Sequence, residues 1–246
     1  VAGPHFVADS LVPVRTARPA RLTGLGGRRT FWGMAQSIIR RPFRYRHFNA
    51  AFILIGINVL VLFVTQLAGT RVLSYLAMNP VLVARQGFVW QLITYMFVHD
   101  GISHILFNML GLLFFGSQLE RRIGSSEFLM FYLVTGFLAG LFSFAVWWFT
   151  GNLQIFLVGA SGAIYGVLLG FATYFPFATI YVFGILPVKA PILVLAFTAI
   201  ELFSQITRLG GRVAHLTHLA GFAAAYLYLM IRLGMNPIKI FLQSRR

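Results

Sequence analysis

The 246-residue sequence contains no cysteine and only five acidic residues. Without cysteine the chain can form no disulfide, no thiolate nucleophile and no cysteine-ligated metal site. Aspartyl proteases and glycosidases need two carboxyl groups facing one site. No such pair is apparent among the acids, which are Asp9, Asp100, Glu120, Glu127 and Glu201. The scarcity of acids therefore argues against paired-carboxylate hydrolysis.

Charged residues make up only 10% of the chain, whereas 59% of the residues are hydrophobic. A soluble domain carries about 25% charged residues, so this composition predicts a polytopic membrane protein. The net charge of +15 raises the possibility of a nucleic-acid partner. However, the basic residues cluster near the N-terminus and in short loops between apolar runs. That distribution favours contact with a lipid bilayer over binding of nucleic acid.

Three regions differ in composition. Residues 1–47 contain nine arginines and no long apolar run, which predicts a basic tail that is disordered or lies on the membrane surface. Residues 48–235 carry the apolar runs, and residues 236–246 form a short basic tail. We expect an all-α fold, a bundle of six membrane-spanning helices. The predicted spans are 49–68, 102–119, 127–149, 158–175, 189–205 and 213–233.

The two longer connections between spans have different characters. Residues 69–100 are semi-polar and aromatic, so we expect a loop partly embedded in the outer interface, where Trp and Tyr are favoured. Residues 176–188 are apolar but bracketed by prolines, so we expect them to run along the interface.

The distribution of basic residues predicts the orientation of the spans. Six spans place both termini on one side, and sixteen of the 20 Lys and Arg residues then lie on that side. The opposite side carries Arg71, Arg85, Arg208 and Arg212. Because positive charge is retained inside the cell, both termini are expected in the cytoplasm. Ser161, at the start of the fourth span, then lies near the outer leaflet.

The fourth span begins with a serine between glycines, in the stretch Gly159-Ala160-Ser161-Gly162. Glycine lets two backbones approach closely, and the start of a helix leaves amide donors without partners. Packing alone explains such a turn in hydrocarbon poorly. We interpret Ser161 as a candidate nucleophile inside the membrane.

Polar residues within spans are functional candidates by default. His104 and Asn108 are four residues apart, so they share one helical face of the second span, and both side chains can donate hydrogen bonds. Hydrogen bonding between transmembrane helices explains this pair equally well.

The sixth span begins with His215 and His218, followed by Gly221 and Ala225. The last two residues form a small-residue face suited to close helix contact. The fourth span has a matching stripe of small residues, which are Gly162, Gly166 and Gly170. Taken alone, such stripes usually indicate plain packing.

If these two faces meet, Ser161 and His218 come within hydrogen-bond reach, as an activated nucleophile requires. Tyr165 lies one turn below Ser161 and can stack on the His218 ring.

A metal site is the alternative use of the histidines. His99, His104, His215 and His218 are all expected near the outer face, and imidazole binds zinc well. The sequence lacks the His-Glu-x-x-His pattern, and no acid stands beside His215 and His218 to act as a base. We therefore expect no metal and no cofactor.

Together these motifs resemble the rhomboid intramembrane serine proteases. The resemblance covers about residues 48–235, and its specificity comes from three motifs in order on the second, fourth and sixth spans. It implies a dyad, with Ser161 as nucleophile and His218 as general base and then acid. The oxyanion would be stabilised by the His104 and Asn108 side chains and the Ser161 amide.

Other residues would have supporting roles. With no acid expected beside His218, Tyr165 packing would have to orient its ring. Glu120 would anchor the cytoplasmic end of the second span. The remaining supporting residues would be Gly159, Gly162, His215 and Gly221.

The resemblance also implies a substrate class and a location. Substrates would be proteins with a single transmembrane segment, cut near its outer end, and the host would be a bacterial inner membrane. Two other functions compete with proteolysis. A catalytically silent rhomboid-fold protein that binds membrane clients is disfavoured because both Ser161 and His218 are present. A transporter or channel is disfavoured because no internal repeat is evident.

Overall fold

A computed structural model describes residues 40–182, 184–207 and 212–244. The chain divides into two compact units, Val1–Ile38 and Ile39–Arg246, and the described residues all belong to the second. Most of the predicted basic tail, residues 1–39, therefore lies outside the described residues. Its last part, residues 40–47, runs without regular structure beside the start of α8, where the Phe43 amide donates to Glu127.

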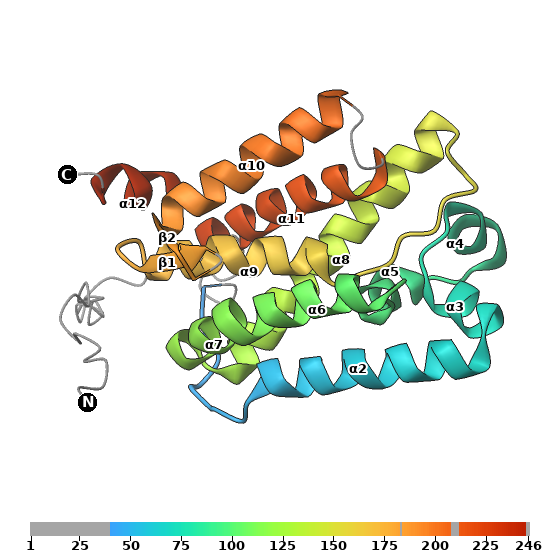
Figure 1. Ribbon diagram of the computed structural model, residues 1–246, viewed down its shortest axis with the longest axis horizontal. Helices are drawn as coiled ribbons and strands as arrows, with labels where there is room; N and C mark the ends of the chain where they lie inside the picture. The colour runs from blue at the N-terminus through green and yellow to red at the C-terminus, as the bar shows by residue number, and fades with distance from the viewer. Residues whose placement is uncertain (1–39, 183, 208–211, 245–246) are drawn as a thin grey trace, which may run out of the picture. The chain divides into compact units, whose positions relative to one another are not determined.

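The six predicted spans are confirmed as helices within a few residues of their expected bounds. Four are long and apolar enough to cross a membrane, and the other two have shorter apolar stretches, Ser161–Tyr174 and His215–Ile231. The long ones are α2 (Ala50–Ala68), the continuous run Ile102–Ile123, α8 (Ser125–Thr150) and α10 (Ala190–Thr207). The others are α9 (Ser161–Tyr174) and α11 (Arg212–Ile231). Figure 1 shows these helices arranged as a bundle.

The second span changes helix type along its length. It consists of α6 (Ile102–Gly111), a π-helical turn η2 (Leu112–Gly116) and α7 (Ser117–Ile123). The predicted anchoring role of Glu120 in α7 is confirmed. Its carboxylate accepts hydrogen bonds from the amides of Ala50 (2.6 Å) and Ala51 (2.9 Å). These amides begin α2 and have no partner within that helix, so Glu120 joins the first two spans by capping one of them.

The connection 69–100 is more ordered than the predicted loop. It forms four short helices, α3 (Thr70–Leu76), α4 (Pro80–Gln86), α5 (Gln91–Thr94) and η1 (Tyr95–Phe97). Met78 forms an antiparallel bridge with Leu157, and the Gly159 amide donates to the Tyr95 carbonyl (3.0 Å). This connection therefore holds the irregular chain that leads into α9.

The segment 176–188 differs from the all-α prediction because it contains a β-hairpin. Strands β1 (Thr179–Val182) and β2 (Leu186–Lys189) pair antiparallel, with Thr179 opposite Lys189 and Val182 opposite Leu186. β-Branched and aromatic residues at 179–182 favour strand conformation. The predicted C-terminal tail also contains a helix, α12 (Pro237–Gln243). The core remains a helical bundle.

Helix α9 lies at the centre of the bundle. It contacts α6, α7, α8, α10 and α11, and eleven of its 14 residues are buried. A helix of this length spans about 21 Å, less than the roughly 30 Å hydrocarbon thickness. It is therefore too short to cross the hydrocarbon layer by itself. The irregular chain before it can enter the bilayer because protein surrounds it.

Candidate active site

Ser161 is the first residue of α9, and its hydroxyl meets an imidazole from α11. Ser161 Oγ lies 2.7 Å from His218 Nε2. The two residues are 57 positions apart in the chain, so only the packing of α9 against α11 brings them together. A serine hydroxyl hydrogen-bonded to a histidine nitrogen is the arrangement of an activated nucleophile.

Close contact between α9 and α11 produces this geometry, as the small-residue faces predict. A methyl group on Gly221 would lie 2.0 Å from the Gly162 carbonyl oxygen, so the two backbones touch there. A methyl group on Gly166 would lie 3.1 Å from Cβ of Ala225. Gly170 departs from the prediction, because its neighbours are Leu119 and Phe131 rather than residues of α11. Two of the three glycines therefore make the contact.

Gly159 shapes the turn before Ser161. Its φ of 110° is a conformation that residues with side chains rarely adopt. A methyl group there would also lie 2.5 Å from Nε2 of His104, so the His104 ring covers this glycine. The supporting role expected for Gly159 therefore has two physical causes, backbone conformation and space.

A cavity of about 850 Å³ opens onto the serine and histidine. His104 and Asn108 of α6 also line it, so the structure brings both expected oxyanion donors to the same space as Ser161 and His218. The wall also includes Tyr181 of the β-hairpin and Phe197 of α10.

The two α6 residues are themselves held by local hydrogen bonds. His104 Nδ1 donates to Asp100 Oδ1 (2.6 Å), and Asn108 Nδ2 donates to the His104 carbonyl (2.8 Å). The neighbouring His99 packs edge-on against the His104 ring, with 4.9 Å between centroids. Burial, with a smaller effect of His104, lowers the pKa of His99 to about 4, so His99 is neutral at physiological pH.

Tyr165 stacks on the His218 ring, as predicted. The ring centroids are 4.2 Å apart and the planes differ by 10°. This contact fixes the plane of the imidazole but does not decide which of its nitrogens carries the proton.

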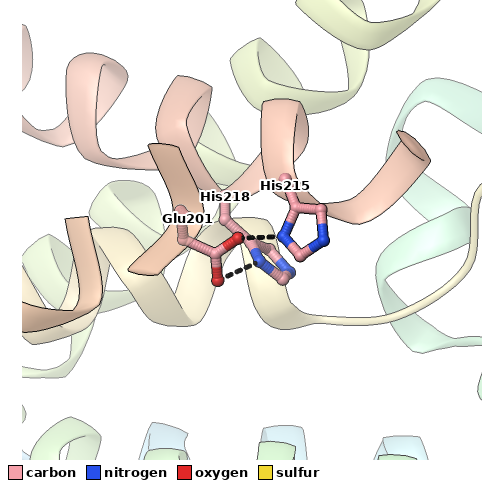
Figure 2. Close-up of side chains that lie close together, drawn as sticks. All are labelled: Glu201, His215 and His218. Carbon is pink, nitrogen blue, oxygen red and sulfur yellow. Dashed lines mark hydrogen bonds and ion pairs between the residues drawn. The ribbon is translucent and has the colours of Figure 1, made fainter. Parts of the chain in front are cut away.

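The expectation that no acid stands beside His218 is wrong. Glu201 of α10 lies there, with only 4% of its surface exposed. Oε1 of Glu201 is 2.9 Å from His218 Nδ1, and its Oε2 is 2.5 Å from His215 Nδ1 (Figure 2). The Tyr165 hydroxyl donates to the same carboxylate. His215 therefore contacts Glu201 and supports the site through it.

Sequence reasoning missed Glu201 because it is remote from both histidines along the chain. An acid alone in the middle of an apolar span was nevertheless a visible signal, since intramembrane carboxylates are costly and usually functional. The sequence did not show which helix face Glu201 occupies or which neighbour that face meets. Only the packing of α10 against α11 supplies that information.

The same three residues form a set with metal-binding chemistry. One ligand atom each from Glu201, His215 and His218 lie within 4.8 Å of one another. Two imidazoles and a carboxylate are donors that suit zinc. In this arrangement, however, both Nδ1 atoms are engaged with the carboxylate oxygens.

The fold and site define an integral multi-pass membrane protein with a hydrogen-bonded serine–histidine pair inside its helical bundle. The family model described as "Rhomboid domain" matches residues 86–235, more than half of the chain. The chain therefore belongs to the rhomboid family.

Named relatives support this membership. The chain is 33% identical over 122 residues to "Rhomboid protease GluP" of Bacillus subtilis, which covers 48% of this chain and 23% of the relative. It is 31% identical over 142 residues to "Rhomboid protein 1, mitochondrial" of Saccharomyces cerevisiae, covering 55% and 39%. It is 37% identical over 78 residues to "Putative rhomboid protease YdcA" of Bacillus subtilis, covering 32% and 37%. The matches thus span less than two-fifths of each of these relatives.

Proposed function

We propose that this chain is an intramembrane serine endopeptidase. The observation that carries the proposal is the 2.7 Å contact between Ser161 Oγ and His218 Nε2 at the wall of a cavity. Membership of the rhomboid family and the printed names of two Bacillus subtilis relatives, which include the word protease, support the same chemistry.

The proposed reaction proceeds through an acyl-enzyme. His218 Nε2 accepts the Ser161 proton while Oγ forms a bond to the scissile carbonyl carbon. The tetrahedral intermediate then collapses, the carbon–nitrogen bond breaks, and His218 gives its proton to the leaving amine. Water next attacks the ester carbonyl while His218 accepts a proton from it. The second tetrahedral intermediate collapses, the bond between the carbonyl carbon and Ser161 Oγ breaks, and His218 returns the proton to Oγ, which leaves a carboxylic acid on the substrate that ionises in water.

The negative oxygen of the tetrahedral intermediate needs hydrogen-bond donors. The Ser161 amide is available because the first backbone bond of α9 is donated by Ile164 to the Ala160 carbonyl (3.0 Å). His104 and Asn108 line the same cavity. We assign these three groups to the oxyanion, where a single preorganised donor contributes about 10²–10³ in kcat in other serine proteases.

The proposed substrates are proteins with a single transmembrane segment, cut near its outer end. A chain that unwinds there could reach Ser161, which begins a helix too short to span the bilayer. We also propose that both termini face the cytoplasm. Arg121, Arg122 and Arg232 lie at the same ends of the bundle as residues 40–47, which agrees with retention of positive charge inside.

The proposed location of the protein is a bacterial inner membrane. Two of the named relatives come from Bacillus subtilis, and one carries a mitochondrial name. Fractionation of cells that express the tagged chain would distinguish these membranes.

Labelling with a fluorescent fluorophosphonate tests the proposed function without knowledge of the substrate. Wild-type protein in detergent and in liposomes is expected to be labelled, whereas Ser161→Ala and His218→Ala are not. A melting curve for each variant shows that it is folded. A folded wild-type protein that resists labelling in both environments, and that leaves a single-pass reporter uncut, would refute the proposal.

A further inference from the structure

Glu201 occupies a costly position for an acid. It lies in the middle of α10, a helix long and apolar enough to cross a membrane, and only 4% of its surface is exposed. A buried carboxylate in such a helix persists only when its oxygens are satisfied by hydrogen bonds or opposite charge. Three side chains hydrogen-bond to it, and they are Tyr165, His215 and His218.

A second buried acid, Glu127 of α8, serves as a comparison, because its partners hold helices together and lie outside the active site. Its oxygens accept from the Arg232 guanidinium (2.6 and 2.9 Å), the Tyr228 hydroxyl (2.6 Å) and the Phe43 amide (3.2 Å). These bonds join the end of α11 to the start of α8 with full charge compensation. By contrast, histidines are the only basic groups within ion-pair distance of Glu201 among the side chains that the structure describes, which exclude those of residues 208–214.

The partners of Glu201 are therefore the active-site groups themselves. His218 touches Ser161, and Tyr165 stacks on His218. Glu201 also comes from a different helix than either of them. Three helices, α9, α10 and α11, each contribute one member of a continuous chain from Ser161 through His218 to Glu201. Figure 2 shows the part of this chain between His218 and Glu201.

We infer that Glu201 is a positioning residue that selects the productive tautomer of His218. An ionised carboxylate can only accept hydrogen bonds, so the His218 proton must sit on Nδ1. Nε2 then carries the lone pair and faces Ser161 Oγ, as a general base requires. When Nε2 takes the serine proton, the adjacent negative charge stabilises the imidazolium while Glu201 itself stays ionised. This role rests on the proposed serine-protease function.

The surrounding bonds hold Glu201 in place for this role. The Tyr165 hydroxyl donates to Oε1, the oxygen that also accepts from His218, and His215 donates to Oε2. The carboxylate is thus restrained from both sides, which fixes the direction of its lone pairs toward Nδ1. The active tautomer consequently depends on α10 being seated against α9 and α11.

Matched glutamate variants test this inference. Glu201→Gln keeps size and shape but can no longer select the tautomer, because an amide can donate as well as accept. We expect the fluorophosphonate labelling rate, and kcat on a single-pass reporter, to fall by about 100-fold or more, with KM changed less than about threefold. Glu201→Asp is expected to recover part of the loss. Glu127→Gln is the control, with a lower melting temperature but a labelling rate close to that of wild type.

A spectroscopic readout separates positioning from general structural support. Nitrogen-15 NMR of histidine-labelled Ser161→Ala protein reports which His218 nitrogen is protonated, without any need for activity. We expect the Nδ1–H tautomer, and a mixture or the Nε2–H tautomer when Glu201→Gln is added. An Nε2–H tautomer in the parent protein would overturn the inference.

Other outcomes are equally distinguishable. A folded Glu201→Gln variant that is labelled at the wild-type rate would refute the role of Glu201 and leave the proposed function intact. Failure of wild-type labelling would instead refute the proposed function. Chelator treatment is expected to change nothing, and a loss of labelling that zinc restores would reassign Glu201, His215 and His218 as a metal site.

Discussion

Two histidine–carboxylate pairs flank Ser161, and they differ chiefly in their contact with water. In the pair from α11 and α10, the His218 and Glu201 side chains are 13% and 6% exposed. In the pair at the start of α6, the His104 and Asp100 side chains are 28% and 70% exposed. The exposed pair has the shorter contact, 2.6 Å against 2.9 Å. The contact distance alone therefore does not show which pair matters more for activity.

The degree of burial decides which pair contributes more, because water screens an exposed charge and offers it alternative hydrogen bonds. Surface ion pairs contribute little to stability, whereas a buried charge that loses its partner is left without compensation. Losing Glu201 should therefore disturb its histidine far more than losing Asp100 disturbs His104. The comparison shows that the effect of a histidine–carboxylate contact depends on how far the contact is shielded from water.

A hydrogen bond from histidine Nδ1 to a carboxylate also has opposite consequences for the expected role of the histidine in the two pairs. A proton held on Nδ1 of His218 leaves Nε2 free to accept, which suits a base. A proton held on Nδ1 of His104 leaves Nε2 without one, so a neutral His104 cannot donate to an oxyanion from Nε2 in that state. A neutral His104 donates from Nε2 only in the tautomer that carries the proton there.

The largest effect is expected when the buried pair is disrupted without touching either member. Gly221→Val places a side chain where the Gly162 carbonyl oxygen lies, so α9 and α11 must separate. Misplacement by about 1 Å can cost about 100-fold in rate, so labelling of Ser161 should fall by at least that factor. The matched change Gly101→Ala, beside the exposed pair, meets no atom within 4 Å and should be tolerated. Equal labelling of both variants would mean that the helix contact does not position the pair.

The next effect concerns the oxyanion donors on α6. His104→Ala and Asn108→Ala are each expected to lower kcat on a single-pass reporter by about 10²–10³, with little change in KM. The reason is that their hydrogen bonds strengthen only as negative charge develops on the substrate oxygen. Steady-state kinetics in liposomes would measure the split. Wild-type kcat in both variants would remove them from the oxyanion site.

A smaller effect is expected for the exposed carboxylate. Asp100→Asn should slow labelling by less than about fivefold, because the pair is largely solvated and a neutral His104 can then adopt the Nε2–H tautomer. Compared with Glu201→Gln, this substitution tests whether burial decides the ranking. A loss from Asp100→Asn as large as that from Glu201→Gln would contradict the explanation given above.

A separate effect, on stability rather than on rate, is expected for the buried His99 beside the exposed pair. Its folded-state pKa of about 4 is below the unfolded value of about 6.5, so the unfolded chain binds this proton first. The free energy of unfolding therefore contains the full contribution of neutral His99 above pH 6.5. It falls by up to about 3 kcal/mol as the pH is lowered toward 4. Melting temperatures of wild type and His99→Gln at pH 7.5 and pH 5 would test this. The wild type should lose more on acidification, and equal losses would refute the assignment.

Sequence patterns predicted the spans well because each span is a local property. Apolar runs of about 20 residues, ended by charges or glycines, located all six helices. Local motifs also predicted the meeting of Gly162 with Gly221 and the stack of Tyr165 on His218, which are confirmed. The hairpin at 179–189 was missed because bracketing prolines were taken as marks of an irregular interfacial segment.

The sequence by itself determined that this chain is a membrane protein, where its helices lie along the chain, and which serine and histidines are candidate active-site residues. Those properties follow from composition and from residues a few positions apart. Only the tertiary structure decided that Glu201 reaches His218 and that α6 lines the same cavity as Ser161. These contacts join residues on helices whose rotation and neighbours no short pattern encodes, because helix packing is set by the fit of whole surfaces.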